Sequence, residues 1–130
     1  MAGSKCRVLC VDDHYDTSEM LELLLSKEDY EVETAGTMEE ACRLAVRKQF
    51  DLYVLDRRLP DATGMELCEK LNELTPTVPC IFYSGDAYEL HRREAMAAGA
   101  AAYVAKPDID GLIDAVQKLL ANSACATTNQ

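Results

Sequence analysis

Short apolar segments alternate with helical segments along the whole chain, and this alternation restricts the fold more than any other feature. The apolar segments are 6–11, 30–34, 52–55, 78–83 and 101–105. The helical segments that follow them are expected to begin near Asp16, Thr37, Met65, Ala87 and Asp110. Apolar strands that are each followed by a helix favour a parallel sheet covered on both faces. Because crossovers are right-handed, we expect a doubly wound α/β fold of the (βα)5 type, a five-stranded parallel sheet in the order 2-1-3-4-5.

Several residues mark the ends of these helices. Thr37 and Glu40 have the spacing of a capping box, and Asp110 is expected to cap the last helix. Gly99 follows a helical segment, where a left-handed residue commonly ends a helix. A chain of 130 residues is the size of one domain. We therefore expect residues 1–122 to form one domain and residues 123–130 to be a flexible tail.

The acidic composition excludes several classes of function. The formal net charge is −10, whereas binding to nucleic acid phosphates requires clustered Lys and Arg side chains. No apolar run approaches the ~20 residues that span a bilayer, and the first residues lack the apolar region of a signal peptide. We expect a cytoplasmic protein that binds neither nucleic acid nor membranes.

Six cysteines, at positions 6, 10, 42, 68, 80 and 125, show neither a CxxC pair nor a spacing typical of zinc ligands. Most of them have apolar neighbours. This pattern predicts small core residues in a reducing cytoplasm, and argues against both a disulfide framework and a zinc site.

Polar side chains stand where the predicted strands end. Asp12 and Asp13 follow the first strand, Asp56 the third, Ser84 the fourth and Lys106 the fifth. Each of these residues taken alone is explained by the preference of Asp and Ser for turns, or by a solvated lysine. Because the carboxyl ends of parallel strands meet at one edge of the sheet, we expect all five side chains to share one rim.

Three carboxylates, a hydroxyl and an ammonium on one rim indicate phosphoryl chemistry. Oxygen ligands favour a hard divalent cation, so Asp12, Asp13 and Asp56 predict a Mg²⁺ site, with Mn²⁺ as an alternative. Asp56 would attack phosphorus as a carboxylate nucleophile, and Ser84 and Lys106 would bind the transferred phosphoryl oxygens. The residues therefore predict a phosphoacceptor site centred on Asp56.

Essentially the whole chain resembles the receiver domain of two-component response regulators, with a flavodoxin-like fold. The motifs that carry the resemblance are Val11-Asp12-Asp13, Asp56 with Leu59-Pro60 and Gly64, Ser84-Gly85, Ala98-Gly99-Ala100, Tyr103 and Lys106-Pro107. Each motif is weak alone, but their order and spacing together are highly specific. The resemblance implies that residues 1–122 are a receiver domain.

The resemblance also implies roles for individual residues. Asp56 would accept phosphate from a phosphohistidine on a histidine kinase or a histidine phosphotransfer protein. Asp13 and Asp56 would ligate Mg²⁺ with the backbone carbonyl of Arg58, and Asp12 would act mainly through a water. Ser84 and Tyr103 would form the switch pair that changes a surface of the fourth and fifth helices and the fifth strand. That surface would signal to a downstream output domain or target protein.

The resemblance implies a cis peptide bond between Lys106 and Pro107 as well. The chemistry of the protein would be limited to taking up and slowly losing its own phosphate.

Two features depart from the family pattern: Arg57 and Arg58 follow Asp56, where many family members have apolar or small polar residues, and Asp108 follows Lys106-Pro107. Arg58 stands two residues after Asp56, and Asp86 stands two residues after Ser84. One hypothesis is that the two side chains form a weak gate over the site that slows dephosphorylation; the alternative is two solvated charges. Asp108 replaces the aromatic or apolar residue that usually follows the Lys-Pro pair, which leaves the packing of the last helix open.

Two other functions remain as alternatives. An aspartate-nucleophile phosphatase also uses Mg²⁺ on a doubly wound sheet, but it requires Asp-x-Asp after the first strand, whereas His14 follows Asp12-Asp13 here. A pseudo-receiver would bind partners without phosphorylation, which the complete set of site residues argues against.

Overall fold

The computed structural model describes residues 5–85, 89–121 and 125. Its strands are β1 (Arg7–Val11), β2 (Glu31–Ala35), β3 (Leu52–Leu55), β4 (Cys80–Ser84) and β5 (Ala102–Ala105). Its helices are α1 (Tyr15–Lys27), α2 (Met38–Arg47), α3 (Gly64–Leu74), α4 (Glu89–Ala97) and α5 (Ile109–Leu120). All strand pairs are parallel, in the order β2-β1-β3-β4-β5. The predicted fold class and strand order are confirmed.

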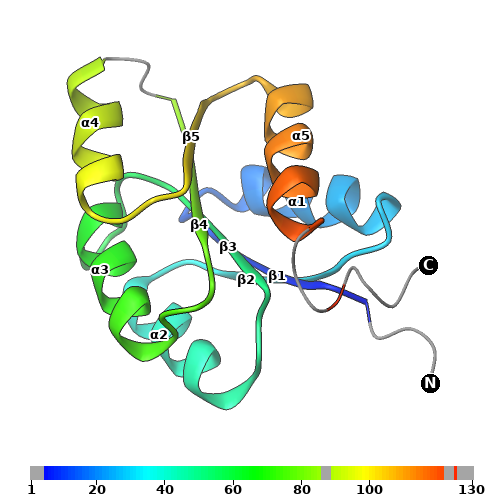
Figure 1. Ribbon diagram of the computed structural model, residues 1–130, viewed down its shortest axis with the longest axis horizontal. Helices are drawn as coiled ribbons and strands as arrows, with labels where there is room; N and C mark the ends of the chain where they lie inside the picture. Colours follow the sequence, from blue (N-terminus) through cyan, green and yellow to red (C-terminus); the bar gives the residue numbers. More distant parts are fainter. Residues whose placement is uncertain (1–4, 86–88, 122–124, 126–130) are drawn as a thin grey trace.

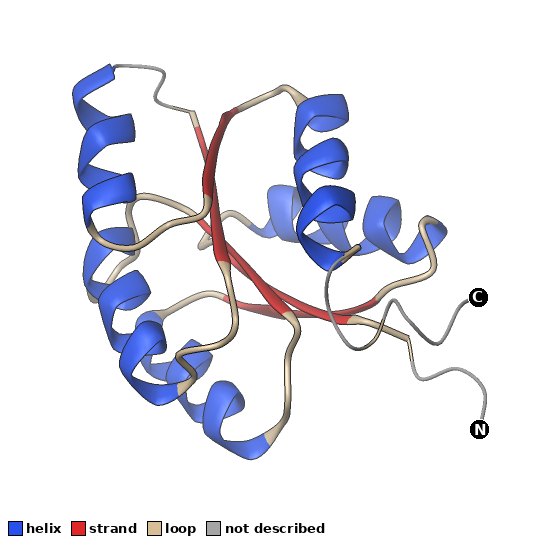
Figure 2. Ribbon diagram, in the orientation of Figure 1, coloured by secondary structure: helices blue, strands red, loops and turns tan. Residues whose placement is uncertain are grey.

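The sheet separates two apolar cores. Helices α1 and α5 cover one face of the sheet, and α2, α3 and α4 cover the other (Figure 1 and Figure 2). All four residues of β3 are buried: Leu52 and Val54 belong to the core under α1 and α5, and Tyr53 and Leu55 to the other. Since successive side chains of a strand point to opposite faces, a central strand covered on both sides must be apolar throughout.

The helix ends follow the sequence signals with two differences. The Thr37 side chain caps α2 by accepting from the Glu40 N–H at 3.1 Å, but the Glu40 carboxylate accepts from the N–H of Gly36 rather than from that of Thr37. Gly99 has a φ of 109°, as expected for a left-handed residue after a helix. The prediction that Asp110 caps the last helix is wrong.

The cap of α5 is Asp108, whose Oδ1 accepts from the N–H of Gly111 at 2.9 Å. Asp110 lies two residues too late, inside the first turn of the helix, where its charge is near the positive end of the helix dipole. This cap gives a role to Asp108, which stands where the family usually has an aromatic or apolar residue: its carboxylate oxygen accepts a hydrogen bond from the first turn of α5.

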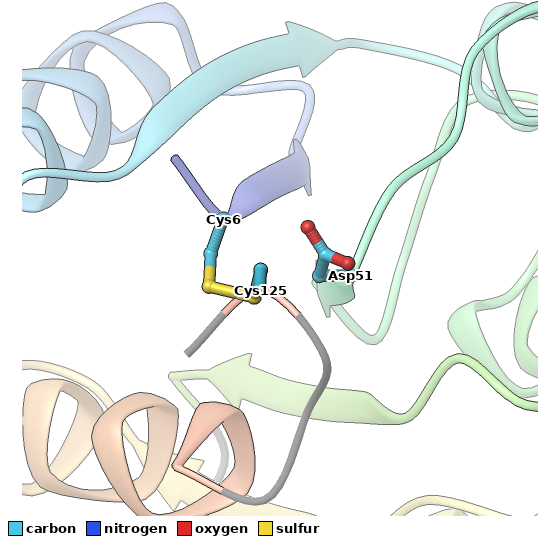
Figure 3. A group of neighbouring side chains, drawn as sticks. All are labelled: Cys6, Asp51 and Cys125. Atoms are coloured by element: carbon cyan, nitrogen blue, oxygen red, sulfur yellow. A yellow bond between two sulfur atoms is a disulfide. The ribbon is translucent and has the colours of Figure 1, made fainter. Parts of the chain in front are cut away.

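The cysteine prediction is wrong for one pair. Cys6 and Cys125 form a disulfide with their Cα atoms 5.2 Å apart, next to Asp51 (Figure 3). The two are 119 residues apart, and only the fold brings them together. Cys10, Cys68 and Cys80 are free and buried, as predicted for core residues, and Cys42 is free and partly buried. The predicted flexible tail, apart from Cys125, lies outside the described residues.

Among the described residues, no helix combines the length and the apolar character needed to cross a membrane.

Candidate functional site

The predicted rim is an open cleft of about 840 Å³ at the carboxyl ends of the strands. Its lining includes Asp13, Asp56, Ser84 and Lys106, which come from four different strand ends. Asp12 lies beneath it and contacts Lys106. The structure therefore brings together all five side chains that the sequence placed on this edge of the sheet.

Carboxylates gather at one point of the cleft. Asp12, Asp13, His14 and Asp56 each offer one ligand atom, and these atoms lie within 4.8 Å of one another. Asp12 and Asp56 are only 5% and 7% exposed, whereas Asp13 is exposed. Buried carboxylates repel one another unless positive charge offsets them. This donor set fits a small divalent cation such as Mg²⁺.

The surroundings of the Asp56 carboxyl shift its pKa in two opposing directions. Burial raises its pKa above the ordinary value, and the nearby Asp12 carboxylate raises it further. Lys106, the Arg57 N–H and His14 act in the opposite direction. The Arg57 N–H donates to Asp56 Oδ1 at 2.8 Å, whereas Oδ2 is the oxygen nearest Lys106. Asp56 thus has one anchored oxygen and one that faces the cationic groups.

Lys106 supplies the fixed positive charge. Its Nζ lies 2.8 Å from Asp12 Oδ2 and 3.8 Å from Asp56 Oδ2. The predicted cis peptide bond between Lys106 and Pro107 is present. The N–H of Lys106 donates to the carbonyl of Ser84 at 2.7 Å, which ties the end of β5 to the end of β4. Ser84 itself is 4% exposed.

His14 is the site residue that sequence reasoning missed. Its Nδ1 lies 3.0 Å from Asp12 Oδ1, 3.2 Å from Asp13 Oδ1 and 4.0 Å from Asp56 Oδ2. The hydrogen bond with Asp12 and the neighbouring Asp13 charge raise the pKa of the imidazole. Its position directly after two predicted site residues was the available signal.

The remaining predicted residues lie around this centre. Tyr103 on β5 stacks on Phe82, with ring centroids 6.2 Å apart, so its role as a switch partner of Ser84 stays a prediction. Arg58 is exposed and lines the cleft. Its proposed gate partner Asp86 lies outside the described residues. Arg57 instead reaches α4, with a guanidinium nitrogen 3.6 Å from a carboxylate oxygen of Glu94.

The loop after Asp56 holds the backbone at Arg58, the predicted source of a carbonyl ligand. Arg58 forms an isolated antiparallel bridge with Thr63. The Leu59 N–H donates to the Ala62 carbonyl at 2.9 Å, and the Gly64 N–H to the Arg57 carbonyl at 2.7 Å. These hydrogen bonds close a tight loop between β3 and α3.

Comparisons with known proteins agree with this geometry. The response regulator receiver domain family matches residues 8–117. Regulatory protein VanR from Enterococcus faecium is 32% identical over 101 residues, which cover 78% of this chain but 43% of VanR. A CheY-like receiver domain from Methanospirillum hungatei is 36% identical, with a TM-score of 0.82 over 89% of this chain and 94% of that one.

A response regulator from Burkholderia pseudomallei, solved with a phosphorylated aspartic acid, a calcium ion and citrate, is 27% identical. The structural match covers 97% of this chain and 71% of the Burkholderia chain, with a TM-score of 0.79. The present chain spans about half the length, or less, of curated relatives such as VanR. The family match, the strand order and the site at the strand ends lead to one conclusion: the chain belongs to the receiver domains of two-component response regulators.

Proposed function

We propose that the chain is a phosphorylation-controlled signalling domain and that Asp56 accepts a phosphoryl group from a phosphohistidine. The observation that carries this proposal is the position of Asp56: the residue is only 7% exposed, yet it lines the open cleft beside Lys106. The proposed donor is a histidine kinase or a histidine phosphotransfer protein. Receiver domains are generally not enzymes in the ordinary sense, so the only chemistry proposed is the gain and slow loss of this phosphoryl group.

The chemistry follows from the two oxygens of Asp56. The Arg57 N–H donates to Oδ1, and Oδ2 faces Lys106. One carboxylate oxygen of Asp56 forms a bond to phosphorus while the phosphorus–nitrogen bond of the donor breaks, and the electron pair of that bond returns to the donor imidazole. Lys106 Nζ, 3.8 Å from Oδ2, is placed to offset the charge of the new phosphoryl oxygens.

A divalent cation would be held by Asp13, Asp56 and the Arg58 carbonyl, with Asp12 close by. When bound, Mg²⁺ or Mn²⁺ supplies further positive charge against the phosphoryl oxygens. The support from this structure is the convergence of the carboxylates within 4.8 Å. The Burkholderia relative with its phosphorylated aspartic acid and calcium ion is consistent with this assignment.

The signal would leave through the surface of α4, β5 and α5. In the proposed switch, the Ser84 hydroxyl binds the phosphoryl group and the Tyr103 ring turns inward. Ser84 is the last residue of β4 and pairs with Ala105 of β5, two residues beyond Tyr103. A change at the site can therefore pass to β5 within one strand pair and reach an output domain or target protein.

We also propose the gate between Arg58 and Asp86. The support is that Arg58 is exposed and lines the cleft, where its guanidinium can lie across the path of an attacking water. Dephosphorylation is expected to be faster in Arg58→Ala and in Asp86→Ala than in the wild type. Unchanged rates in both variants would show that these are two solvated charges.

Labelling with a small acyl phosphate tests the central proposal. The wild type incubated with acetyl phosphate and Mg²⁺ should gain one phosphoryl group, mapped to Asp56 by mass spectrometry after borohydride trapping. Asp56→Asn should abolish the label and Asp13→Asn should reduce it. Asp114→Asn, which changes an exposed carboxylate on α5 outside the cleft, is the control and should label normally. A wild type that gains no label on Asp56 would favour a partner-binding pseudo-receiver.

A further inference from the structure

We infer that His14 is a metal ligand, and that its nitrogen gives the site a preference for first-row transition metals over Mg²⁺. This inference rests on the proposed function, because it adds a ligand to the same cation site. Carboxylate and carbonyl oxygens alone suit Mg²⁺, whereas an imidazole nitrogen suits Co²⁺, Ni²⁺ and Zn²⁺. One residue would thus determine which metals the receiver domain binds.

The three distances from His14 Nδ1 to carboxylate oxygens are those expected in an octahedral centre. With ligands about 2.1 Å from the ion, neighbouring ligand atoms are about 3.0 Å apart and opposite ones about 4.2 Å apart. His14 Nδ1 lies 3.0 Å from Asp12 Oδ1 and 3.2 Å from Asp13 Oδ1, the spacing of neighbours. It lies 4.0 Å from Asp56 Oδ2, the spacing of opposite ligands.

The surrounding hydrogen bonds direct one oxygen of each buried carboxylate toward this point. Lys106 holds Asp12 Oδ2, which leaves Oδ1 facing His14. The Arg57 N–H holds Asp56 Oδ1, which leaves Oδ2 facing His14 and Lys106. The centre is therefore arranged by contacts that lie outside it, as in sites where outer groups orient the ligands.

The backbone places the imidazole as well. The His14 N–H donates to Asp12 Oδ1 at 2.9 Å, which fixes the turn between β1 and α1. His14 is the N-cap residue of α1, but its side chain makes no capping hydrogen bond. The ring is directed at the carboxylates instead, and its side chain is 68% exposed, so a metal ion can reach it from the cleft.

A simpler role for His14 predicts the opposite result. An imidazole that only balances the charge of the carboxylates would compete with a metal ion, and removing it would tighten metal binding. If the imidazole ligates the metal, its removal would eliminate one metal–ligand bond and weaken metal binding. The sign of the change in affinity distinguishes the two roles.

Calorimetric titrations with Ni²⁺ and with Mg²⁺ measure whether the metal affinity rises or falls when His14 is removed. His14→Ala should weaken Ni²⁺ binding by at least roughly 10- to 100-fold, the loss seen when even an outer-shell partner of a metal ligand is removed. The affinity for Mg²⁺ should fall much less, because Mg²⁺ prefers oxygen and keeps several waters. His91→Ala, which removes the other of the two histidines, is the matched control and should leave Ni²⁺ binding unchanged.

Nitrogen NMR identifies the ligand directly. In protein labelled with [¹⁵N]histidine, Zn²⁺ should shift the Nδ1 resonance of His14 and leave that of His91 in place. Unchanged or tighter Ni²⁺ binding in His14→Ala, or an unshifted Nδ1, would overturn the inference. If acetyl phosphate still labels Asp56 of the wild type, the proposed function stands in that case. If Asp13→Asn weakens the binding of neither metal, the proposed cation site is misplaced and the His14 inference fails with it, whereas labelling of Asp56 still decides the phosphoacceptor proposal.

Discussion

The backbone of Gly64 packs directly against the carbonyl oxygen of Asp56. A Cβ atom at position 64 would lie 2.1 Å from that oxygen and 2.8 Å from Cε2 of Phe82. Neither neighbour can move easily, because Asp56 follows a central strand and Phe82 is fully buried. The absence of a side chain at Gly64 is therefore part of what positions the proposed phosphoacceptor.

Gly64→Ala should accordingly damage both the fold and the site. The added methyl must displace the Asp56 backbone or the Phe82 ring, and such overpacking lowers the free energy of unfolding by about 1–3 kcal/mol. Urea denaturation measures this loss. Labelling by acetyl phosphate should also slow, because the Asp56 oxygens move relative to Lys106.

Gly36→Ala is the matched control for this substitution. A Cβ at Gly36 would meet no atom within 4 Å. Its free energy of unfolding should stay within about 0.5 kcal/mol of the wild type. Equal losses in the two variants would show that the close approach at Gly64 is not the cause.

The cap of α5 gives a second prediction. Asp108→Ala removes the oxygen that accepts from the Gly111 N–H, so the free energy of unfolding should fall by about 0.5–2 kcal/mol. Asp110→Ala removes the same type of side chain from the first turn, where its charge interacts favourably with the helix dipole, and should lower the free energy of unfolding less. Thermal unfolding of the two variants compares them. A greater loss in Asp110→Ala would contradict the assignment of the cap.

The sequence predicted those features of the site that depend on topology alone. Asp12, Asp56, Ser84 and Lys106 each lie at or directly after the last residue of a strand, and the carboxyl ends of parallel strands lie at the same edge of the sheet. His14 was missed because its role depends on the direction of one side chain at the start of α1. The choice between Asp108 and Asp110 depends on the backbone conformation after Pro107, which pattern and composition do not give.

The disulfide shows a different limit of sequence reasoning. Cys6 and Cys125 lack any characteristic spacing, and their contact exists only because the fold places Cys125 beside Cys6, the residue directly before β1 (Figure 3). Within the part of the chain that the structure describes, the other four cysteines are free. Their neighbours in sequence are no less apolar than those of Cys6, so composition does not separate the two kinds.

Reduction of this disulfide should destabilise the protein. The bond joins residues 119 apart, and closing so long a loop restricts the unfolded chain by roughly 4–5 kcal/mol in the chain-entropy description, with measured losses of about 2–5 kcal/mol. Cys125→Ser should reproduce the loss and abolish the effect of a reducing agent on the unfolding midpoint. Cys42→Ser, at a free and partly buried cysteine, is the control and should keep that effect. If the reducing agent does not change the unfolding midpoint of the wild type, the prediction is contradicted.

The last prediction concerns pH and the start of α2. Asp61 Oδ1 accepts from the Met38 N–H at 2.9 Å and Oδ2 from the Glu39 N–H at 3.1 Å, which satisfies two backbone donors of the first turn. These hydrogen bonds, above all that from Met38, hold the pKa of the Asp61 carboxyl below its ordinary value. The unfolded chain therefore binds more protons than the folded one between the two pKa values. The stability that Asp61 contributes is present above the ordinary pKa and is lost as the pH falls through the lowered one.

Asp61→Asn should consequently be less stable than the wild type at neutral pH. The difference should shrink once the pH drops below about 4, because the wild-type carboxyl is then protonated as well. Denaturant unfolding from neutral pH to about pH 3 follows this convergence. Asp16→Asn, in the first turn of α1, controls for the loss of a charge near a helix start. A difference for Asp61→Asn that stays constant or widens in acid would mean that Met38 and Glu39 do not stabilise the charged form.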